Sequence, residues 1–344
     1  MIYARIVIFF LFFSIFFPQV ESISSYVTFG QDSNPMKLSK DELDESNNNL
    51  FMDKYNTSSS YIKLYTKIHS SFSLFKRKTK VDFAFKINSF IDLDEKSNYG
   101  IYLKLKQPIG NYQYIKFDYT FIPDIFLREY DDGDYVYQYF DFIQDVSYQC
   151  YFNLSKYSIQ YQRPLANRKN KISFILNQET QFYNKYFTEF DLEINSFKIL
   201  YTKKNKNNNY SFSYEYSFAD NLTLFDGNVS TSFMDRGYDE RKINLSYSHK
   251  FDNFSIGGSL NMAERSYSST IPQDNLHLDR NHDDEKLSVW IKFKFNGLSQ
   301  KIIFSNRTRN TNSPENWVEE LKTFDRYDLS YAVYFKKISL GRAK

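Results

Sequence analysis

The chain of 344 residues has little of the chemistry from which many functional sites are built. Its single cysteine, Cys150, excludes an internal disulfide, and no CxxC spacing is present to bind a metal ion. The four histidines are scattered along the chain rather than grouped. We therefore expect neither a metal site nor a cofactor.

Neither sign of charge dominates the sequence. The 44 lysines and arginines are interleaved with 41 aspartates and glutamates, and the formal net charge is only +3. A nucleic-acid-binding surface needs basic side chains gathered on one face. The charge pattern therefore predicts that nucleic acid is not a partner.

Long hydrophobic runs are also missing, with one exception at the N-terminus. Residues 6–17 form an apolar run after Arg5, and Pro18 ends it. The run has the length of a signal-peptide core and is shorter than the roughly 17–25 residues of a spanning helix. Val20 and Ser22 supply small residues for cleavage after Ser22. We predict a signal peptide over residues 1–22, and a mature chain that either leaves the membrane or crosses it as strands.

Aromatic residues are abundant, with 30 tyrosines and 35 phenylalanines, although the mean hydropathy is only −0.57. Both properties fit one chain if large apolar residues alternate with polar ones, as in "YIKFDYTF" (114–121). Successive side chains of a strand point to opposite faces of a sheet. This stretch therefore has one apolar and one polar face, formed respectively by Ile115, Phe117, Tyr119 and Phe121 and by Lys116, Asp118 and Thr120.

The same alternation recurs from Ser58 onward and predicts an all-β protein. The alternating segments are 60–68, 81–87, 99–106, 114–121, 135–143, 147–154, 157–162, 171–176, 187–194, 197–203, 210–218, 228–233, 242–249, 254–262, 287–295, 300–306 and 327–335. Short Asn-, Asp- and Gly-containing turns such as 203–209, 251–253 and 296–297 are typical of hairpins. The longer interruptions are 122–134, 267–286 and 309–326. We predict a single up-and-down antiparallel barrel of about 16 strands (14–18) over residues 58–344, with short turns at one end and long loops at the other.

Residues 23–57 are acidic, asparagine-rich and without period-two alternation. We interpret them as a low-complexity N-terminal tail. The alternative is a short helix that Ser39 caps, ahead of Asp41 and Glu42.

The apolar face of the strands could pack in a protein core or contact lipid. In "YSFSYEYSF" (210–218) every apolar position is a full-size aromatic residue, whereas a close-packed core needs small residues between large ones. A chain of this length folded as a sandwich would normally divide into two domains, and we see no linker. Both observations favour a barrel in lipid.

With these features the chain resembles bacterial outer-membrane β-barrel proteins of the porin-like type. The resemblance covers the region from about Ser58 and is architectural. It implies an outer-membrane location. Such proteins often end in an aromatic residue, which assists their assembly, whereas here "KKISLGRAK" follows Phe335.

Catalytic patterns in the sequence are weak. His69 and Ser71 share one strand face with the spacing of a Ser–His pair, but a chance occurrence explains this better in a serine-rich chain. "NHDDE" (281–285) is interpreted as charged loop surface. The acidic "DDGD" (131–134) could hold a hard cation, although the remaining ligands of a calcium loop are missing. We therefore predict that the protein is not an enzyme.

The sequence leads to the hypothesis of a passive porin-like channel for small polar solutes or ions, with outer-membrane lipid as its surroundings. Because the lumen charges are mixed in sign, we expect weak selectivity. One alternative is a structural or adhesive barrel plugged by residues 23–57 or 122–134, and another is a secreted β-sandwich binding module. Association with further copies of the chain, as a homo-oligomer, is left open. The expected pore-lining residues are Lys63, Lys86, Lys104, Lys116, Asp118, Glu189, Asp191 and Lys242.

Overall fold

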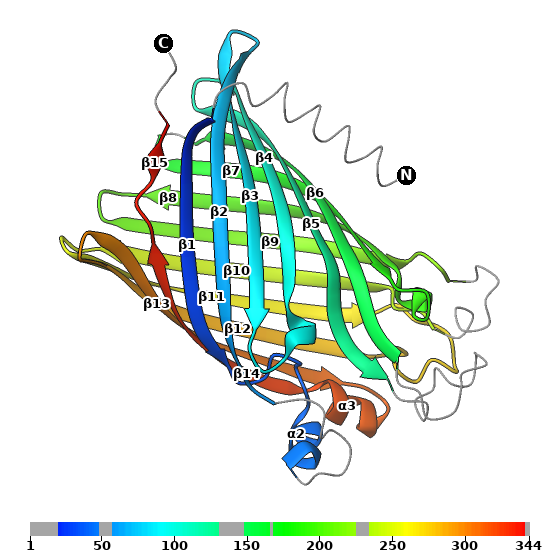
Figure 1. Cartoon of the computed structure of the whole chain (residues 1–344). Coiled ribbons are helices and arrows are strands. Elements are labelled where there is room, and N and C mark those ends of the chain that lie inside the picture. The colour runs from blue at the N-terminus through cyan, green and yellow to red at the C-terminus, as the bar shows by residue number, and fades with distance from the viewer. Residues whose placement is uncertain (1–19, 48–56, 131–147, 166–167, 225–233, 341–344) are drawn as a thin grey trace.

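The computed structural model describes residues 20–47, 57–130, 148–165, 168–224 and 234–340, and here the strands form one closed antiparallel barrel (Figure 1). Each strand pairs with its neighbours in sequence, and β14 pairs with β1 to close the wall. A two-residue strand, β15 (Ile338–Ser339), also pairs with β1. The fourteen strands of the wall are β1 (Val20–Asp32), β2 (Ser59–Leu74), β3 (Arg77–Phe90), β4 (Asn98–Gly110), β5 (Gln113–Tyr130), β6 (Tyr148–Pro164), β7 (Asn170–Tyr183), β8 (Leu192–Lys204), β9 (Asn208–Asn221), β10 (Tyr238–Lys250), β11 (Phe254–Tyr267), β12 (Asn281–Phe295), β13 (Leu298–Asn312) and β14 (Phe324–Tyr334).

The up-and-down barrel is as predicted, and its strand number lies at the lower limit of the expected range. The sequence overcounts because polar residues interrupt long strands. Segments 147–154 and 157–162 correspond to one strand, β6, and β8 contains the end of 187–194 (residues 192–194) together with all of 197–203. Segments 135–143 and 228–233 lie outside the described residues.

Short turns and long connections occupy opposite ends of the barrel. The turn between β12 and β13 has positive φ at Asn296 (50°) and Gly297 (76°), as a two-residue hairpin turn requires. At the other end, the long-loop end, lie α2 (Lys40–Asn47), η1 (Asp94–Lys96), η3 (Thr188–Phe190) and α3 (Asn316–Lys322) (Figure 1). The described parts of the three interruptions predicted to be long loops fall there, although strands extend into each of them.

The N-terminal boundary differs from the prediction. Residues 20–32 are not part of a tail but form β1, which lies between β14 and β2 in the wall. The alternation of residues in "YVTF" (26–29) indicates this strand. It is short, and the acidic stretch that follows it has no alternation, so the sequence alone does not separate the two. Cleavage after Ser22 would remove the first three residues of β1. The signal peptide itself stays a prediction, since residues 1–19 lie outside the described part.

The helical alternative for residues 40–47 is confirmed. The Ser39 hydroxyl accepts a hydrogen bond from the Glu42 amide (3.2 Å), and a Glu42 carboxylate oxygen accepts one from the Ser39 amide (2.8 Å). This reciprocal capping box satisfies two amides at the start of α2. The capping box stabilises the start of α2, in a stretch whose composition alone indicates low complexity.

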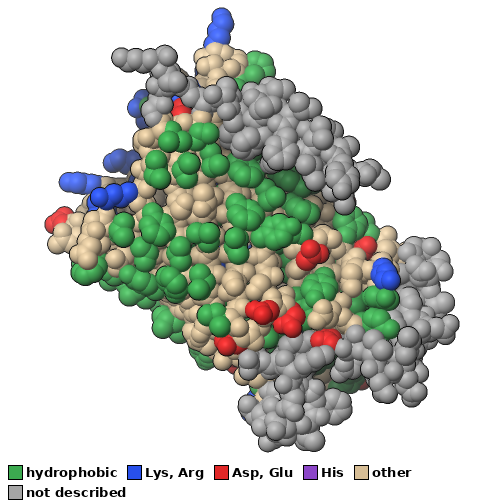
Figure 2. Space-filling model, viewed as in Figure 1, with side chains coloured by type: hydrophobic (Ala, Val, Ile, Leu, Met, Phe, Trp, Pro, Cys, Tyr) green, Lys and Arg blue, Asp and Glu red, His purple; other side chains and the backbone are tan. Residues whose placement is uncertain are grey.

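The two faces of the wall differ as the alternation predicts. On β9 the five aromatic side chains from Tyr210 to Phe218 are 39–45% exposed on the outer surface, whereas Ser213 and Ser217 on the inner face are buried. Figure 2 shows hydrophobic side chains spread over the outer wall, with acidic side chains concentrated towards the long-loop end. In "YIKFDYTF" (114–121), Ile115 is 43% exposed on the outer face.

The inner face of the seam between β14 and β1 carries two polar contacts. The Tyr61 ring on β2 lies across Gly30 of β1, where a Cβ atom would fall 2.3 Å from the ring, and the Tyr61 hydroxyl donates to Asp328 of β14 (2.7 Å). Beside it, the fully buried Asp32 accepts hydrogen bonds from the Arg326 guanidinium. The absence of a side chain at Gly30 therefore allows one tyrosine to bridge three strands.

Among the described residues, no helix has the length and apolar character needed to cross a membrane.

Candidate functional site: the charged lumen and its constriction

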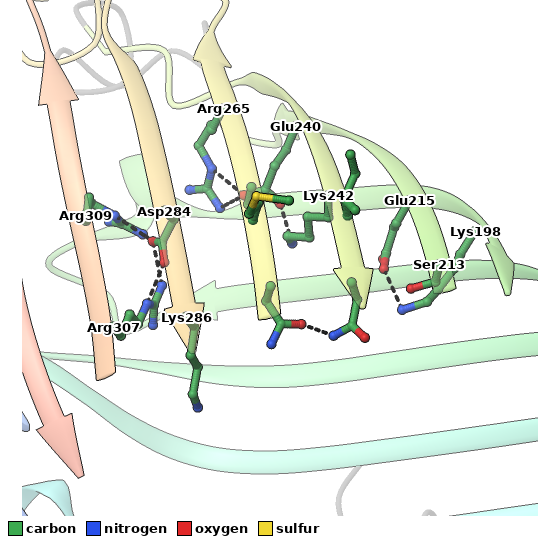
Figure 3. Close-up of a pocket in the computed structure, with 15 residues that line it drawn as sticks. Lys198, Ser213, Glu215, Glu240, Lys242, Arg265, Asp284, Lys286, Arg307 and Arg309 are labelled. Carbon is green, nitrogen blue, oxygen red and sulfur yellow. Dashed lines mark hydrogen bonds and ion pairs between the residues drawn. The ribbon is translucent and has the colours of Figure 1, made fainter. Parts of the chain in front are cut away.

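A series of ion pairs runs across the inner faces of β8 to β13 (Figure 3). Lys198 and Glu215 are opposite each other on β8 and β9, with nitrogen and oxygen 3.1 Å apart. The same inner face then presents Glu240, which contacts both Lys242 and Arg265, the latter at 2.8 Å. These side chains border a recess of about 270 Å³ in the inner wall.

Two arginines share one carboxylate in this series. Asp284 on β12 accepts hydrogen bonds from Arg307 (2.6 and 2.7 Å) and from Arg309 (2.9 and 2.6 Å), both on β13. A single carboxylate neutralises one positive charge, so this group keeps a net charge of +1. Lys286 lies on the same face of β12, and Figure 3 shows it extending away from these pairs.

The opposite part of the wall also carries cross-strand ion pairs. The nitrogen–oxygen distances are 3.4 Å for Lys104–Asp118 and 2.9 Å for Lys156–Glu179. Opposite charges on facing positions of neighbouring strands stabilise a sheet by roughly 0.2–1 kcal/mol each. The lumen carboxylates are thus largely neutralised by the wall itself.

Several inward-facing lysines have no such partner. Lys86, Lys116 and Lys286 have no carboxylate within 4 Å in the part of the chain that the structure describes. Lys116 reaches only the side-chain oxygen of Gln160 (3.4 Å), and Lys63 lies 3.6 Å above the Tyr61 ring. The inner wall therefore carries an excess of positive charge.

The connection from β1 to α2 folds inwards and narrows the lumen at the long-loop end. Met36 and Leu38 pack in a buried cluster with inner-face residues that include Tyr61 and Phe90. The Asn34 side-chain amide donates to the carbonyl oxygens of Leu38 (2.8 Å) and Asp325 (3.1 Å). We call residues 33–39 the constriction segment.

Basic groups surround the constriction segment. Enclosure by the walls, together with the nearby Arg307, lowers the pKa of Lys37 to about 7. The Lys96 ammonium of η1 donates to the carbonyl oxygen of Phe126 (2.8 Å), and burial lowers its pKa to about 8. Arg128 of β5 holds α2 in place through Glu42 (3.0 Å). Basic side chains thus lie on several sides of the constriction segment.

Six of the eight residues predicted to line the pore lie on the inner face of the wall, and their role in lining a pore stays a prediction. Glu189 and Asp191 lie outside the strands. Glu189 lies in η3 and is 1% exposed beside a cluster containing Phe187 and Phe190. Asp191 is buried and accepts a hydrogen bond from the Tyr183 amide (2.6 Å). Their alternation with apolar residues mimics a strand, but a 3-10 turn occupies this position. The six that face inwards are Lys63, Lys86, Lys104, Lys116, Asp118 and Lys242.

The weak catalytic patterns do not assemble into a site. His69 contacts Asp82 (2.5 Å) and Glu21 (3.4 Å), and the Ser71 hydroxyl donates to Glu21. His69 and Ser71 thus share the Glu21 carboxylate as a neighbour, and no hydrogen bond between the two is found in the described structure. "NHDDE" is not loop surface but begins β12. The acidic residues 131–134 lie outside the described part. No group of three potential metal ligands occurs among the described residues.

Sequence reasoning missed the strongest charges of the inner wall. Arg265, Asp284, Arg307, Arg309 and Arg326 all lie at strand ends that the sequence assigns to loops or leaves unassigned. The alternation "RTR" (307–309) places two arginines on one face and was the available signal.

Glu189→Gln is expected to stabilise the protein at alkaline pH. Burial raises the pKa of Glu189 from 4.5 to about 7, and one of its carboxylate oxygens has no hydrogen-bond partner in the described structure. Because the folded-state pKa is the higher one, stability falls as pH rises from about 4.5 to about 7. Glutamine avoids ionisation, so we expect a gain of about 3 kcal/mol above pH 7.5 and almost none at pH 4.5.

Urea unfolding in lipid vesicles at both pH values measures this difference. The exposed Glu320→Gln provides the matched control, with no change expected at either pH. Equal stabilisation by Glu189→Gln at both pH values would show that the buried carboxylate does not ionise.

A closed antiparallel barrel with an apolar outer face, a charged inner face and alternating short and long connections defines a transmembrane β-barrel of the outer-membrane type. No protein-family model and no curated protein matches the sequence. Among solved structures, the chain is similar to the outer-membrane channel DcaP of Acinetobacter baumannii, with 7% identity, 91% of this chain and 96% of that chain covered, and a TM-score of 0.48.

Two further solved structures show the same kind of likeness. OccAB3 of A. baumannii has 11% identity, coverage of 93% and 100%, and a TM-score of 0.44. An anion-selective porin from Comamonas acidovorans has 7% identity, coverage of 92% and 99%, and a TM-score of 0.43. At these values the similarity concerns barrel architecture.

Proposed function

We propose that the protein is a passive outer-membrane channel for small polar solutes, with a preference for anions. The observation that carries this proposal is the set of inward-facing lysines without a carboxylate partner, above all Lys86, Lys116 and Lys286.

The presence of these unpaired lysines is an argument that water fills the lumen. Moving an unpaired ammonium group from water into a dry interior costs many kcal/mol. The side chain of Lys286 is exposed, and those of Lys86 and Lys116 are partly exposed, although all three point inwards. A barrel of this width leaves an aqueous lumen unless loops fill it. Hydration of the lumen is the condition for passage of a polar solute.

The arrangement of charge supports anion preference rather than the weak selectivity expected from the sequence. Lumen carboxylates such as Glu215, Glu240 and Asp284 are each held by one or two basic side chains. The positive field of the remaining lysines is therefore not cancelled. A field of one sign in a low-dielectric channel attracts ions of the opposite sign.

The plugged barrel is the second candidate, and the constriction segment is the observation that favours it. Met36 and Leu38 bury apolar surface against the inner wall, as a plug would. Recordings in planar bilayers separate the two functions. The proposal expects stable unitary conductance steps from purified, folded protein. A folded barrel that inserts without conducting would establish the plugged form.

A further inference from the structure

Four buried polar atoms at the long-loop end of the inner wall have no hydrogen-bond partner in the described structure. They are both ring nitrogens of His282, the Nε atom of Arg280 and the hydroxyl oxygen of Thr311. His282 is 3% exposed and Arg280 is 4% exposed. Native proteins rarely leave buried polar atoms unpaired, because each costs about 1–3 kcal/mol. Such a cluster therefore requires a hydrogen-bond partner from outside the protein, either water or an ion.

The register of the strands brings these groups together. His282 on β12 is directly opposite Arg265 on β11 and Thr311 on β13. Arg280 lies two residues before His282, and both contact the ring of Tyr267. The Arg280 guanidinium carbon is 3.8 Å from the ring centroid, and the two ring centroids of Tyr267 and His282 are 5.3 Å apart.

The surroundings are strongly basic. Arg265, Arg280, Arg309 and Lys322 all lie within electrostatic range of His282. Arg265 pairs with Glu240 and Arg309 pairs with Asp284, although each carboxylate also serves a second basic side chain. Arg280 and Lys322 have no carboxylate within 4 Å among the described residues. Lys322 is the last residue of α3, and the next residue, Thr323, accepts a hydrogen bond from the Thr311 amide (3.1 Å). The end of α3 thus lies over the cluster.

We propose that Arg280, His282, Thr311 and Lys322 form a binding site for a small oxyanion such as sulfate or phosphate. Guanidinium, imidazole, hydroxyl and ammonium groups are the donors that such an anion accepts from. Partly exposed Lys322 has a long, flexible side chain that can move to admit it. This site is independent of the proposed channel function, because it would bind an anion in a non-conducting barrel as well as in an open one.

Calorimetric titration of the full chain in detergent with sodium sulfate, at constant ionic strength in chloride, tests this site. His282→Phe keeps a ring against Tyr267 but removes both nitrogens. We expect it to weaken sulfate binding at least tenfold. We also expect it to raise the thermal midpoint of the anion-free barrel, since two unpaired buried nitrogens disappear. His249→Phe is the matched control, because His249 contacts Asn208 (2.7 Å) at the opposite end of the barrel.

Two results would overturn the proposal. One is a wild-type protein that does not bind sulfate, or binds it as tightly after His282→Phe. The other is a lower thermal midpoint for anion-free His282→Phe, which would mean that internal water satisfies the histidine. Heat-dependent gel mobility verifies that each variant is a folded barrel. Conduction is not measured, so the outcome is independent of whether the protein forms an open channel.

Discussion

Replacing Lys86, Lys116 and Lys286 together with glutamate is expected to change the channel from anion-preferring to cation-preferring. Each substitution alters the lumen charge by two units, and none breaks an ion pair found in the described structure. We expect the ratio of chloride to potassium permeability to fall by roughly tenfold or more, equivalent to about 1.4 kcal/mol in the difference between the two barriers. Reversal potentials in a potassium chloride gradient measure the ratio.

The control for this experiment changes the same amount of charge outside the lumen. Lys76, Lys206 and Lys337 lie in turns or extended chain at the short-turn end, and all are exposed. Their replacement with glutamate is expected to leave the reversal potential nearly unchanged. If both triple variants shifted it equally, selectivity would arise at the mouth of the barrel and not along the wall.

Removing the constriction segment together with α2 is expected to increase unitary conductance. Asp32 and Ser59 are opposite each other at the ends of β1 and β2, so a two-residue Asn-Gly hairpin can replace residues 33–58. This change removes Met36, Lys37 and Leu38 from the lumen while it retains Asp32 and its contact with Arg326. We expect conductance to roughly double or more, because the narrowest part of a pore dominates its resistance.

Lys37→Met serves as the control for the shortened loop. At pH 6, below the Lys37 pKa of about 7, it removes the charge of the segment but keeps its volume, so it is expected to reduce anion preference with only a small change in conductance. An unchanged conductance after the replacement of residues 33–58 would show that the narrowest point of the pathway lies elsewhere. Heat-dependent gel mobility again verifies folding.

Much of the fold follows from local pattern. Period-two alternation such as that of "YIKFDYTF" specifies which face of a strand is apolar, and turn residues such as Asn296 and Gly297 specify hairpins. These are local properties, and the closed sheet then follows because each strand needs a partner on both sides. The location of the lumen charges Lys116 and Asp118 could be predicted for the same reason.

Other features depend on contacts between residues far apart in the sequence. β1 contacts the Tyr61 ring through Gly30 and the Arg326 guanidinium through Asp32, and both partners are too far away in the sequence for a local pattern to reveal them. Period-two alternation also predicts a strand wrongly where the chain forms a 3-10 turn, as at Glu189. The proposed oxyanion site requires the register of three strands and the position of α3, so His282 and Thr311 could not be associated from the sequence. Pairing register and loop placement are global properties of the folded chain.

The reversal potential of the unmodified channel in a potassium chloride gradient is the most direct test of the central claim, that an excess of lysine charge lines a water-filled lumen. The account predicts clear conductance steps and a potential with the sign of chloride preference. Clear conductance with potassium preference would contradict it, since the lumen charge would then not control the passage of ions.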